Sequence, residues 1–459
     1  MIKKFYLIGL LAYLYMAVLS ILFYQERTII LDTAFVVFNI VKDATYNIQH
    51  FRFGNLFSQL LPVLARRCNM PLSFILKSYS ISFVAYYLVC YALCGLYFKK
   101  YQFGLVVLLL NILFAADTFY WIPSEIPQGI ALLMVVFAYL DKNRNSQPGI
   151  FNWAIIGFII FSLVFFHPLL IVPFFFSIGY FLLNGEVFVN RKFYFRLIAV
   201  YILSLVLKIT LFRTNYEAHS MGGLKNFITC FPNYFTLYSE KLFVHNCIHK
   251  YYWIPVIFVI VVGYYIGIRA WLKLVFFASA FLGYFFLVSI CYPTSVTPDF
   301  YRENLYLPLS VFLALPILFE ILPKFKDTKI VKLAFALILI SAGLRFFTYH
   351  KEYRARLDWQ KDFLTKYGGK KRIINSKNVD AHLLLMNWGT PYEFCLLSSL
   401  NNGPTESIII DDKPEDRDWA GGETKRFLVN WNIYSYTELP SQYFRFQDTS
   451  KGYIVDRNN

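Results

Sequence analysis

The feature that most constrains this chain is a series of apolar segments, each long enough to cross a bilayer as a helix. A hydrocarbon core of about 30 Å takes roughly 20 consecutive apolar residues. About eleven such segments occur, near residues 5–24, 78–97, 103–120, 124–140, 150–166, 168–184, 195–212, 252–268, 274–291, 305–322 and 329–346. Only 16% of the residues are charged, against about 25% in soluble domains. We therefore predict a polytopic α-helical membrane protein.

The basic residues predict how the chain is oriented in the membrane. Lysines and arginines stand between alternate apolar segments, at 3–4, 99–100, 142–144, 191–196, 269–273 and 324–329. Cytoplasmic loops carry the excess of basic residues, so the N terminus and these turns are expected in the cytoplasm. The expected location is the plasma membrane, as in the inner membrane of a bacterium. The net charge of +16 is then explained by the basic residues of the cytoplasmic turns. The expected partners are membrane lipids, and no nucleic acid is expected.

An odd number of spans places the remaining segments outside the cytoplasm. These are the loops 25–77 and 213–251 and a soluble extracytoplasmic domain, 347–459, which follows the membrane domain, 1–346. In the first loop, RFGNLFSQLLPVLARR has apolar residues at helical spacing and predicts an amphipathic helix in the membrane interface. In the tail, candidate strands near 372–375, 407–410, 432–436 and 453–455, with a helix near 392–400, predict a small mixed α/β fold.

Polar residues that could carry chemistry gather at the predicted outside boundary. Asp32 follows the first apolar segment, and Glu125 lies between Pro123 and Pro127 after the third. Charged residues are costly next to the hydrocarbon core of a bilayer, so carboxylates at the ends of apolar segments indicate a functional site. The other candidates at this boundary are Asp43, His50, Arg52, His167, Lys208, Arg302 and Tyr306. We therefore predict a site at the extracytoplasmic surface of the bilayer.

This layout resembles the GT-C superfamily of integral-membrane glycosyltransferases, which take sugars from polyprenyl-phosphate carriers. The resemblance lies in the acid after the first span, the interfacial helices, the acid of the second outside turn and the soluble tail. It matches Asp32 and Glu125 to the two acidic positions of the family, and Arg302, Tyr306 and Pro308 to an arginine–tyrosine–proline pattern before a late span. It implies a GT-C-like fold, a polyprenyl-phosphate-linked sugar as donor, and a glycan, lipid or protein as acceptor.

The chemistry of such a transfer needs residues of these types. A carboxylate takes the proton of the acceptor hydroxyl as the new bond forms, and direct attack inverts the anomeric centre. We assign this role of general base to Asp32, and to Glu125 the orientation of the acceptor or of a metal. A divalent cation is neither required nor excluded by this pair. Acceptor-binding roles are assigned to Asp43, His50 and His167.

Cations are expected to hold the departing phosphate of the donor. The planar fork of an arginine suits phosphate oxygens. The residues assigned to the phosphate are Arg52, Lys208, Arg302 and Tyr306. A further basic group on the outside, Arg66, Arg67 and Lys77, is expected to attract the anionic carrier.

Three of these residues also have a purely structural interpretation that depends on helix ends. Asp32 could be the N-cap of a helix. Glu125 could complement the helix dipole from the first turn. Lys208 could extend its side chain to the lipid headgroups.

Two further residues could serve only to shape the boundary. Arg302 could form an ion pair with Asp299 or Glu303. His167 and Pro168 could simply end one apolar helix and start the next.

The seven cysteines leave one question open. Cys230 and Cys247 share one predicted outside loop, and could form a disulfide or remain free. No Cys/His spacing indicates a structural zinc site.

Two other classes of function fit parts of the sequence. An O-antigen-polymerase-like enzyme, which joins lipid-linked oligosaccharides, also has about a dozen spans, but its large outside loop lies mid-chain. A lipid or sugar transporter would show interrupted helices in two matching halves. The chain shows no such repetition.

Overall fold

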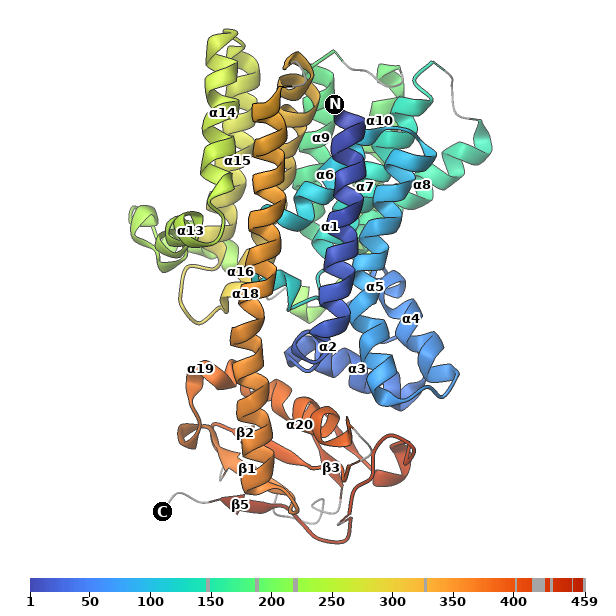
Figure 1. The fold of residues 1–459 in the computed structure, drawn as a ribbon, viewed down its shortest axis with the longest axis vertical. Coiled ribbons are helices and arrows are strands. Elements are labelled where there is room, and N and C mark those ends of the chain that lie inside the picture. Colours follow the sequence, from blue (N-terminus) through green and yellow to red (C-terminus); the bar gives the residue numbers. More distant parts are fainter. Residues whose placement is uncertain are drawn as a thin grey trace.

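A computed structural model describes residues 1–145, 149–185, 190–217, 222–325, 328–400, 403–414, 426–429, 432–447 and 449–456. The chain is mostly helical, at 73%. Figure 1 shows an elongated molecule in which a bundle of long helices is followed by a smaller region with strands at one end. The N terminus lies at the opposite end of the bundle from that region.

Six helical segments are long and apolar enough to cross a membrane. They are α1 (Ile2–Leu22), α5 with its π-helical end (Leu72–Tyr97), α10 (Arg191–Leu211), α15 (Trp271–Cys291), α16 to α17 with their irregular end (Asp299–Lys324) and α18 (Lys329–Tyr367). A possible seventh span is α13 (Tyr238–His249) with α14 (Trp253–Gly267), two helices that meet at a bend of 92°. Within the described ranges, the length and apolar composition of these helices indicate integration into a membrane.

The remaining predicted segments also form helices, but they do not qualify as spans by themselves. They are α6 (Tyr101–Ile112), α7 (Glu125–Lys142), α8 (Ile150–Val164) and α9 (Ile171–Leu183). The structure thus supports six or seven spans of the eleven predicted. The expected helix at 103–120 stops at Ile112, because the backbone N–H groups of Ala116 and Thr118 both donate to Glu303 Oε1, at 2.7 Å each.

Three helices fill the loop between the first two long helices: α2 (Tyr24–Thr28), α3 (Leu31–Asp43) and α4 (Asn55–Arg67). The amphipathic helix predicted here is α4, and its apolar side chains Leu56, Phe57, Leu60, Leu61 and Leu64 are exposed. An exposed apolar face of this kind is typical of helices at a membrane surface.

Arg66 and Arg67 have a role that the sequence did not reveal. Arg66 Nε donates to the carbonyl of Val41 at 2.7 Å, and Arg67 Nε donates to that of Ala44 at 3.0 Å. These carbonyls lie at the C-terminal end of α3, where cations satisfy unpaired acceptors and complement the helix dipole. The two arginines therefore tie α4 to the end of α3.

Helix α18 runs without a break from the bundle into the C-terminal region. There, β1 (Arg372–Asn375), β2 (Ile408–Asp411) and β5 (Ile454–Asp456) form a parallel sheet in the order β2-β1-β5. A second, antiparallel pair consists of β3 (Phe427–Leu428) and β4 (Ile433–Tyr434). Two helices, α19 (Ala381–Leu384) and α20 (Thr390–Ser399), complete the region. The mixed α/β character predicted for the tail is present, with β3 as an additional strand.

Helix α3 connects the bundle to the C-terminal region. Its aromatic side chains Phe35 and Phe38 pack against Tyr392 of α20, with ring centroids 5.1 and 5.2 Å apart. Apolar contact on both sides buries most of α3. The helix that begins with Leu31 and Asp32 is therefore held between the two parts of the molecule.

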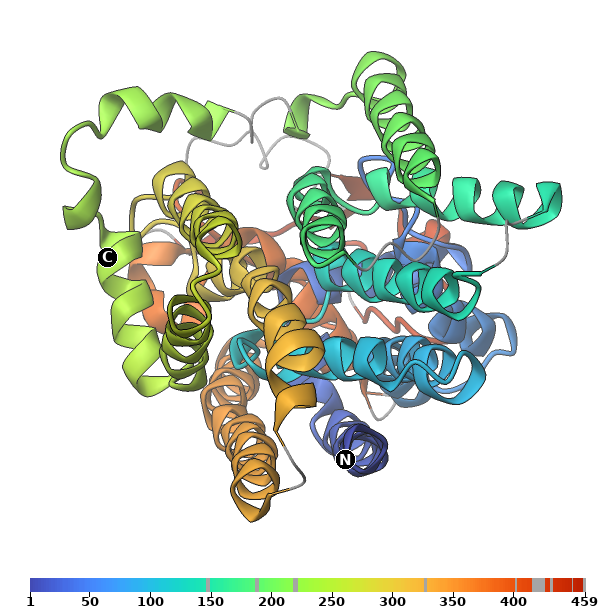
Figure 2. The ribbon, with the colours of Figure 1, turned by 90° about the horizontal axis from the view of Figure 1, so that it is seen from above.

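The segment between α10 and α14 contains the short helix α12 (Asn226–Thr229) and α13, and lies at the edge of the bundle in Figure 2. Cys230 and Cys247, both in this segment, are free thiols, as are the other five cysteines. The structure therefore contains no disulfide between them.

Candidate functional site

Asp32 lies at the start of α3, with one of its carboxylate oxygens held by two donors. Tyr301 OH donates to Asp32 Oδ2 at 2.6 Å, and Trp121 Nε1 donates to the same oxygen at 3.2 Å. The residue in the N-cap position of α3 is Ile30, so Asp32 is not the helix cap. The three side chains come from the loop after the first span, the turn after α6 and the start of α16.

The surroundings of Asp32 make it a stronger base than an ordinary aspartate. Burial raises the pKa of its carboxyl, and the negative charge of Glu125 raises it further, while the hydrogen bonds of Tyr301 and Trp121 act in the opposite direction. A general base is most effective when its pKa approaches the working pH. Asp32 is therefore better suited to accept a proton than an ordinary aspartate.

Glu125 is held rigidly by the local sequence. It is the first residue of α7, and Pro127, with its fixed φ, stands in the first turn of that helix. Its carboxylate accepts a bond of 3.2 Å from Arg52 Nη1 and one of 2.9 Å from Asn55 Nδ2. An acid at a helix N-terminus is also favoured by the dipole, which agrees with the structural interpretation of Glu125.

Arg52 reaches this acid from the loop before α4. Burial is the largest single effect and lowers the pKa of its guanidinium, but the charges of Glu125, Tyr216 and Glu217 and the hydrogen bond to Glu125 together raise the pKa above its usual value. Its Nε is buried and, among the described residues, has no hydrogen-bond partner. An unpaired buried donor requires an explanation, and this one leaves Arg52 able to bind a further acceptor.

His50 and Tyr216 lie next to Arg52. Their rings are stacked with centroids 4.3 Å apart, and Arg52 lies over the ring of Tyr216 at 5.7 Å. Burial and the positive charge of Arg52 lower the pKa of His50. His50 is therefore present mainly as a neutral imidazole, able to donate and accept hydrogen bonds.

Lys208, near the end of α10, is buried and paired rather than extended to the headgroups. Its Nζ lies 3.0 Å from Glu217 Oε1 and donates to the carbonyl of Val164 at 3.2 Å. Burial, together with the positive charges of Arg52 and Lys208, lowers the pKa of His167 well below its usual value. These charges influence one another, so Lys208, Arg52 and His167 belong to one group.

His167 also has the structural role considered for it. Its Nδ1 accepts the N–H of Leu169 at 3.1 Å, which starts the 3₁₀ turn Pro168–Leu170 before α9. The Nε2 position remains for other partners.

Two of the predicted site residues, Arg302 and Tyr306, make their contacts away from Arg52 and Lys208. Arg302 binds the carbonyl of Thr294 at 2.6 Å and Asp299 at 3.0 Å, which is one of the ion pairs considered for it. Tyr306 shares a hydrogen bond of 2.8 Å with Ser289. Arg302 and Tyr306 therefore do not join Arg52 and Lys208 in the structure.

Asp43 stands at the other end of α3 from Asp32. Its carboxylate pairs with Lys42 at 2.6 Å and is largely exposed. With a rise of 1.5 Å per residue, the two aspartates are separated by ~16 Å along the helix. Asp43 is therefore not part of the group around Asp32.

Five residues of the group were not identified from the sequence: Trp121, Tyr301, Asn55, Tyr216 and Glu217. Tyr301 and Arg302 are neighbours, but consecutive residues of a helix point about 100° apart, and it is Tyr301 that faces Asp32. Trp121 could have been found as a polar-edged aromatic four residues before Glu125. Asn55 and Glu217 carry no signal in the sequence.

A second buried polar group fixes the segment between α6 and α7. Besides the two backbone bonds already described, Glu303 accepts the hydroxyl of Tyr251 at 2.6 Å. Asp117 pairs with Lys250 at 2.8 Å. Ser124 is hydrogen-bonded to Asn304. The bonds of Glu303 and Asn304 attach the segment to α16, and so place Trp121 and Glu125 relative to Tyr301.

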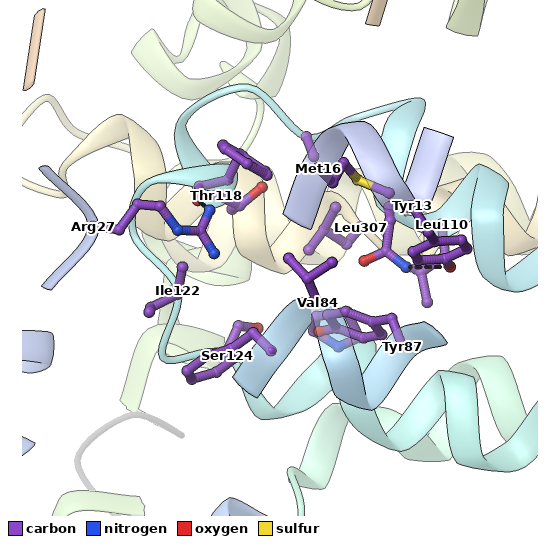
Figure 3. A pocket seen from close by; sticks show the side chains of 15 residues that line it. Tyr13, Met16, Arg27, Val84, Tyr87, Leu110, Thr118, Ile122, Ser124 and Leu307 are labelled. Carbon is purple, nitrogen blue, oxygen red and sulfur yellow. Dashed lines mark hydrogen bonds between the residues drawn. The ribbon is translucent and has the colours of Figure 1, made fainter. Parts of the chain in front are cut away.

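A cavity of about 50 Å³ lies behind this segment. Figure 3 shows Arg27 at one end of it and Tyr13 at the other, with Ser124 below. Asn111 Nδ2 donates a hydrogen bond to Tyr13 OH. The volume of the cavity suits a few water molecules and not a sugar. Asp32, Glu125 and Arg302 do not line this cavity.

No group of three or more His, Cys, Asp or Glu side chains in the described ranges is placed to hold a metal ion.

No known protein family, no curated protein and no solved structure matches this chain.

Proposed function

We propose that this protein is a membrane glycosyltransferase that moves a sugar from a polyprenyl-phosphate carrier to a hydroxyl acceptor at the extracytoplasmic face. The acceptor belongs to a glycan, a lipid or a protein, and the transfer inverts the anomeric centre. Such an enzyme would serve glycan synthesis in the cell envelope. The GT-C resemblance supports the proposal, together with the group of charged residues at one end of the bundle.

The observation that carries the proposal is the environment of Asp32. Two donors hold Oδ2, so Oδ1 is the oxygen left to accept the proton of the acceptor hydroxyl. Proton removal by a positioned carboxylate contributes typically 10²–10⁴-fold to a rate. The acceptor oxygen then attacks the anomeric carbon, and the bond from that carbon to the phosphate oxygen breaks. The polyprenyl phosphate leaves as an anion.

Arg52 and Lys208 are the groups proposed to hold the departing phosphate. Each has a carboxylate partner, Glu125 or Glu217. A phosphate would take the place of a carboxylate on either cation, since both are anionic oxygen acceptors. The unpaired Nε of Arg52 supplies one further donor for such an anion. Arg302 and Tyr306, with their separate contacts, are not needed for this role.

The neutral histidines and the amide of Asn55 are proposed to orient the acceptor. His50 can donate and accept hydrogen bonds, and His167, whose Nδ1 already accepts the N–H of Leu169, can donate one from Nε2 to a sugar hydroxyl. Glu125, which stays hydrogen-bonded to Asn55, then orients the acceptor rather than acting as the base.

The experiment uses the purified full chain in lipid vesicles with a polyprenyl-phosphate-linked sugar, and measures transfer to an acceptor or slow hydrolysis. We expect Asp32→Asn to lose at least about 10²-fold of the rate, because the variant has no base. Asp43→Asn is the matched control and should retain full activity, since Asp43 lies at the far end of the same helix. Full activity of Asp32→Asn would refute the assignment of the base.

A further inference from the structure

The carboxylate of Glu393, from α20 in the C-terminal region, reaches the first residue of α3. The backbone N–H of Leu31 donates to Glu393 Oε1 at 2.6 Å. Leu31 has a φ of 38°, in the left-handed region that residues other than glycine rarely adopt. Such a backbone conformation persists only where its surroundings determine it. Glu393 is one of the groups that hold this residue in place.

The second oxygen of the same carboxylate is bound to α18. Arg356 Nη2 lies 2.7 Å from Glu393 Oε2, and Gln360 Nε2 donates to that oxygen at 2.8 Å. Glu393 is fully buried, and Arg356 nearly so. A buried ion pair with further hydrogen bonds is rigid, and loss of one partner leaves a buried charge unpaired. Glu393 thus joins three helices, α18, α20 and α3, at one point.

A close backbone approach at Gly389 acts on the same residue. A Cβ added at Gly389 would lie 2.8 Å from Leu31 Cδ2 and 3.0 Å from Leu31 Cα. Atoms do not come this close, so an alanine at this position would displace Leu31. Glu393 and Gly389 therefore determine the position of Leu31 from the same side.

We propose that Glu393 is a positioning residue, through which the C-terminal region sets the orientation of Asp32. The inference rests on the proposed function for the meaning of that orientation. Asp32 follows Leu31 directly, so the conformation of Leu31 decides where the Asp32 carboxylate meets Tyr301 and Trp121. In the full chain, the C-terminal region is then a required part of the site, although it adds no group to the reaction.

The test compares Glu393→Gln with Glu406→Gln in the full chain in lipid vesicles. An amide at 393 has one acceptor oxygen, so it can serve Leu31 or Arg356, but not both. Glu406 is a matched control, because it too accepts a backbone N–H, that of Gly369 at 2.8 Å, within the same region. We expect Glu393→Gln to lower kcat by up to about 10²-fold, the cost of misplacing a reacting group by 1 Å.

The donor KM separates positioning from general damage. Because Glu393 does not touch the substrate, KM should stay unchanged while kcat falls, measured on protein that elutes as a single folded species. Gly389→Ala should produce the same pattern by displacing Leu31. Wild-type kcat in Glu393→Gln would overturn the inference and leave the proposed function intact.

A second measurement does not depend on transferase activity. Dicyclohexylcarbodiimide reacts with protonated carboxyl groups in apolar surroundings, and mass spectrometry quantifies its attachment to Asp32. We expect slower labelling of Asp32 in Glu393→Gln than in the wild type, because a displaced carboxylate loses its buried environment. Labelling no slower than in the wild type would overturn the inference. If the wild type transfers no sugar, the proposed function fails, and this labelling comparison still decides the role of Glu393.

Discussion

Trp121 and Tyr301 pack edge to face, with ring centroids 4.7 Å apart, while both donate to the same oxygen of Asp32. The two residues come from separate segments, and each fixes the ring of the other. A carboxylate bound in this way has one immobilised oxygen and one available oxygen. Under the proposed function, this arrangement orients the base before the substrate arrives.

Tyr301→Phe tests this arrangement directly, since it removes the 2.6 Å hydrogen bond and keeps the ring. A hydrogen bond to a charged group contributes about 1.5–3 kcal/mol, so we expect the transfer rate to fall by roughly 10- to 100-fold. Tyr284→Phe is a suitable control, because Tyr284 donates to the carbonyl of Leu305 and to no residue of the site. Equal losses in the two variants would contradict a specific role for Tyr301.

The pH dependence of transfer follows from the raised pKa of Asp32. A base must be ionised, so the rate should fall as the pH drops through this pKa, with a midpoint above the ordinary aspartate value of about 3.9. Tyr301→Phe removes a bond that lowers the pKa, and should move this midpoint to still higher pH. Initial rates measured over a pH series check both statements. A midpoint at or below the ordinary value would contradict the assignment of Asp32.

The same pKa shift predicts an effect on stability. The folded-state pKa of Asp32 lies above its unfolded-state value, so the folded protein holds this proton more tightly and loses stability as the pH rises through the interval between the two values. At neutral pH the ionised Asp32 therefore lowers the free energy of unfolding. Asp32→Asn should unfold at a higher temperature than the wild type there, with a smaller difference in acid. A lower unfolding temperature for Asp32→Asn at neutral pH would be the contrary result.

The ion pair between Lys208 and Glu217 allows a double-mutant test. Lys208→Met leaves Glu217 buried without its partner, which typically costs 3–5 kcal/mol. The double variant Lys208→Met, Glu217→Gln removes both charges and should recover much of that stability, as thermal unfolding in detergent would show. Its transfer reaction should still have a raised donor KM, because a cation for the phosphate is missing. An unchanged KM would remove Lys208 from the phosphate site.

The sequence predicted those parts of the fold and site that depend on local pattern. Apolar length identified helical segments, and helical spacing identified the exposed face of α4. Asp32 and Glu125 were found because a carboxylate next to an apolar segment is rare, and a proline in the first turn fixes the second of them. Both are signals within one short stretch of chain.

What the sequence did not provide was the choice of partner over long distances. The pair Arg52 and Glu125 is separated by 73 positions, and Tyr301 and Asp32 by 269. Such contacts depend on how the helices are rotated and packed, which cannot be predicted from the local pattern of a single sequence. Arg302 was chosen over Tyr301 for its charge, whereas the direction in which each side chain leaves α16 decides the contact. The count of eleven spans is supported only for six or seven, because shorter apolar helices such as Tyr101–Ile112 and Ile150–Val164 look like spans in the sequence.

The unbroken length of α18 has a mechanical consequence. Its 39 residues correspond to a length of ~58 Å. One end of α18 packs among the helices of the bundle, and the other end leads into the strands of the C-terminal region. A tilt of about 5° at the bundle end would shift the far tip by ~5 Å. Changes in bilayer thickness could thus be transmitted along this lever to the distant sheet.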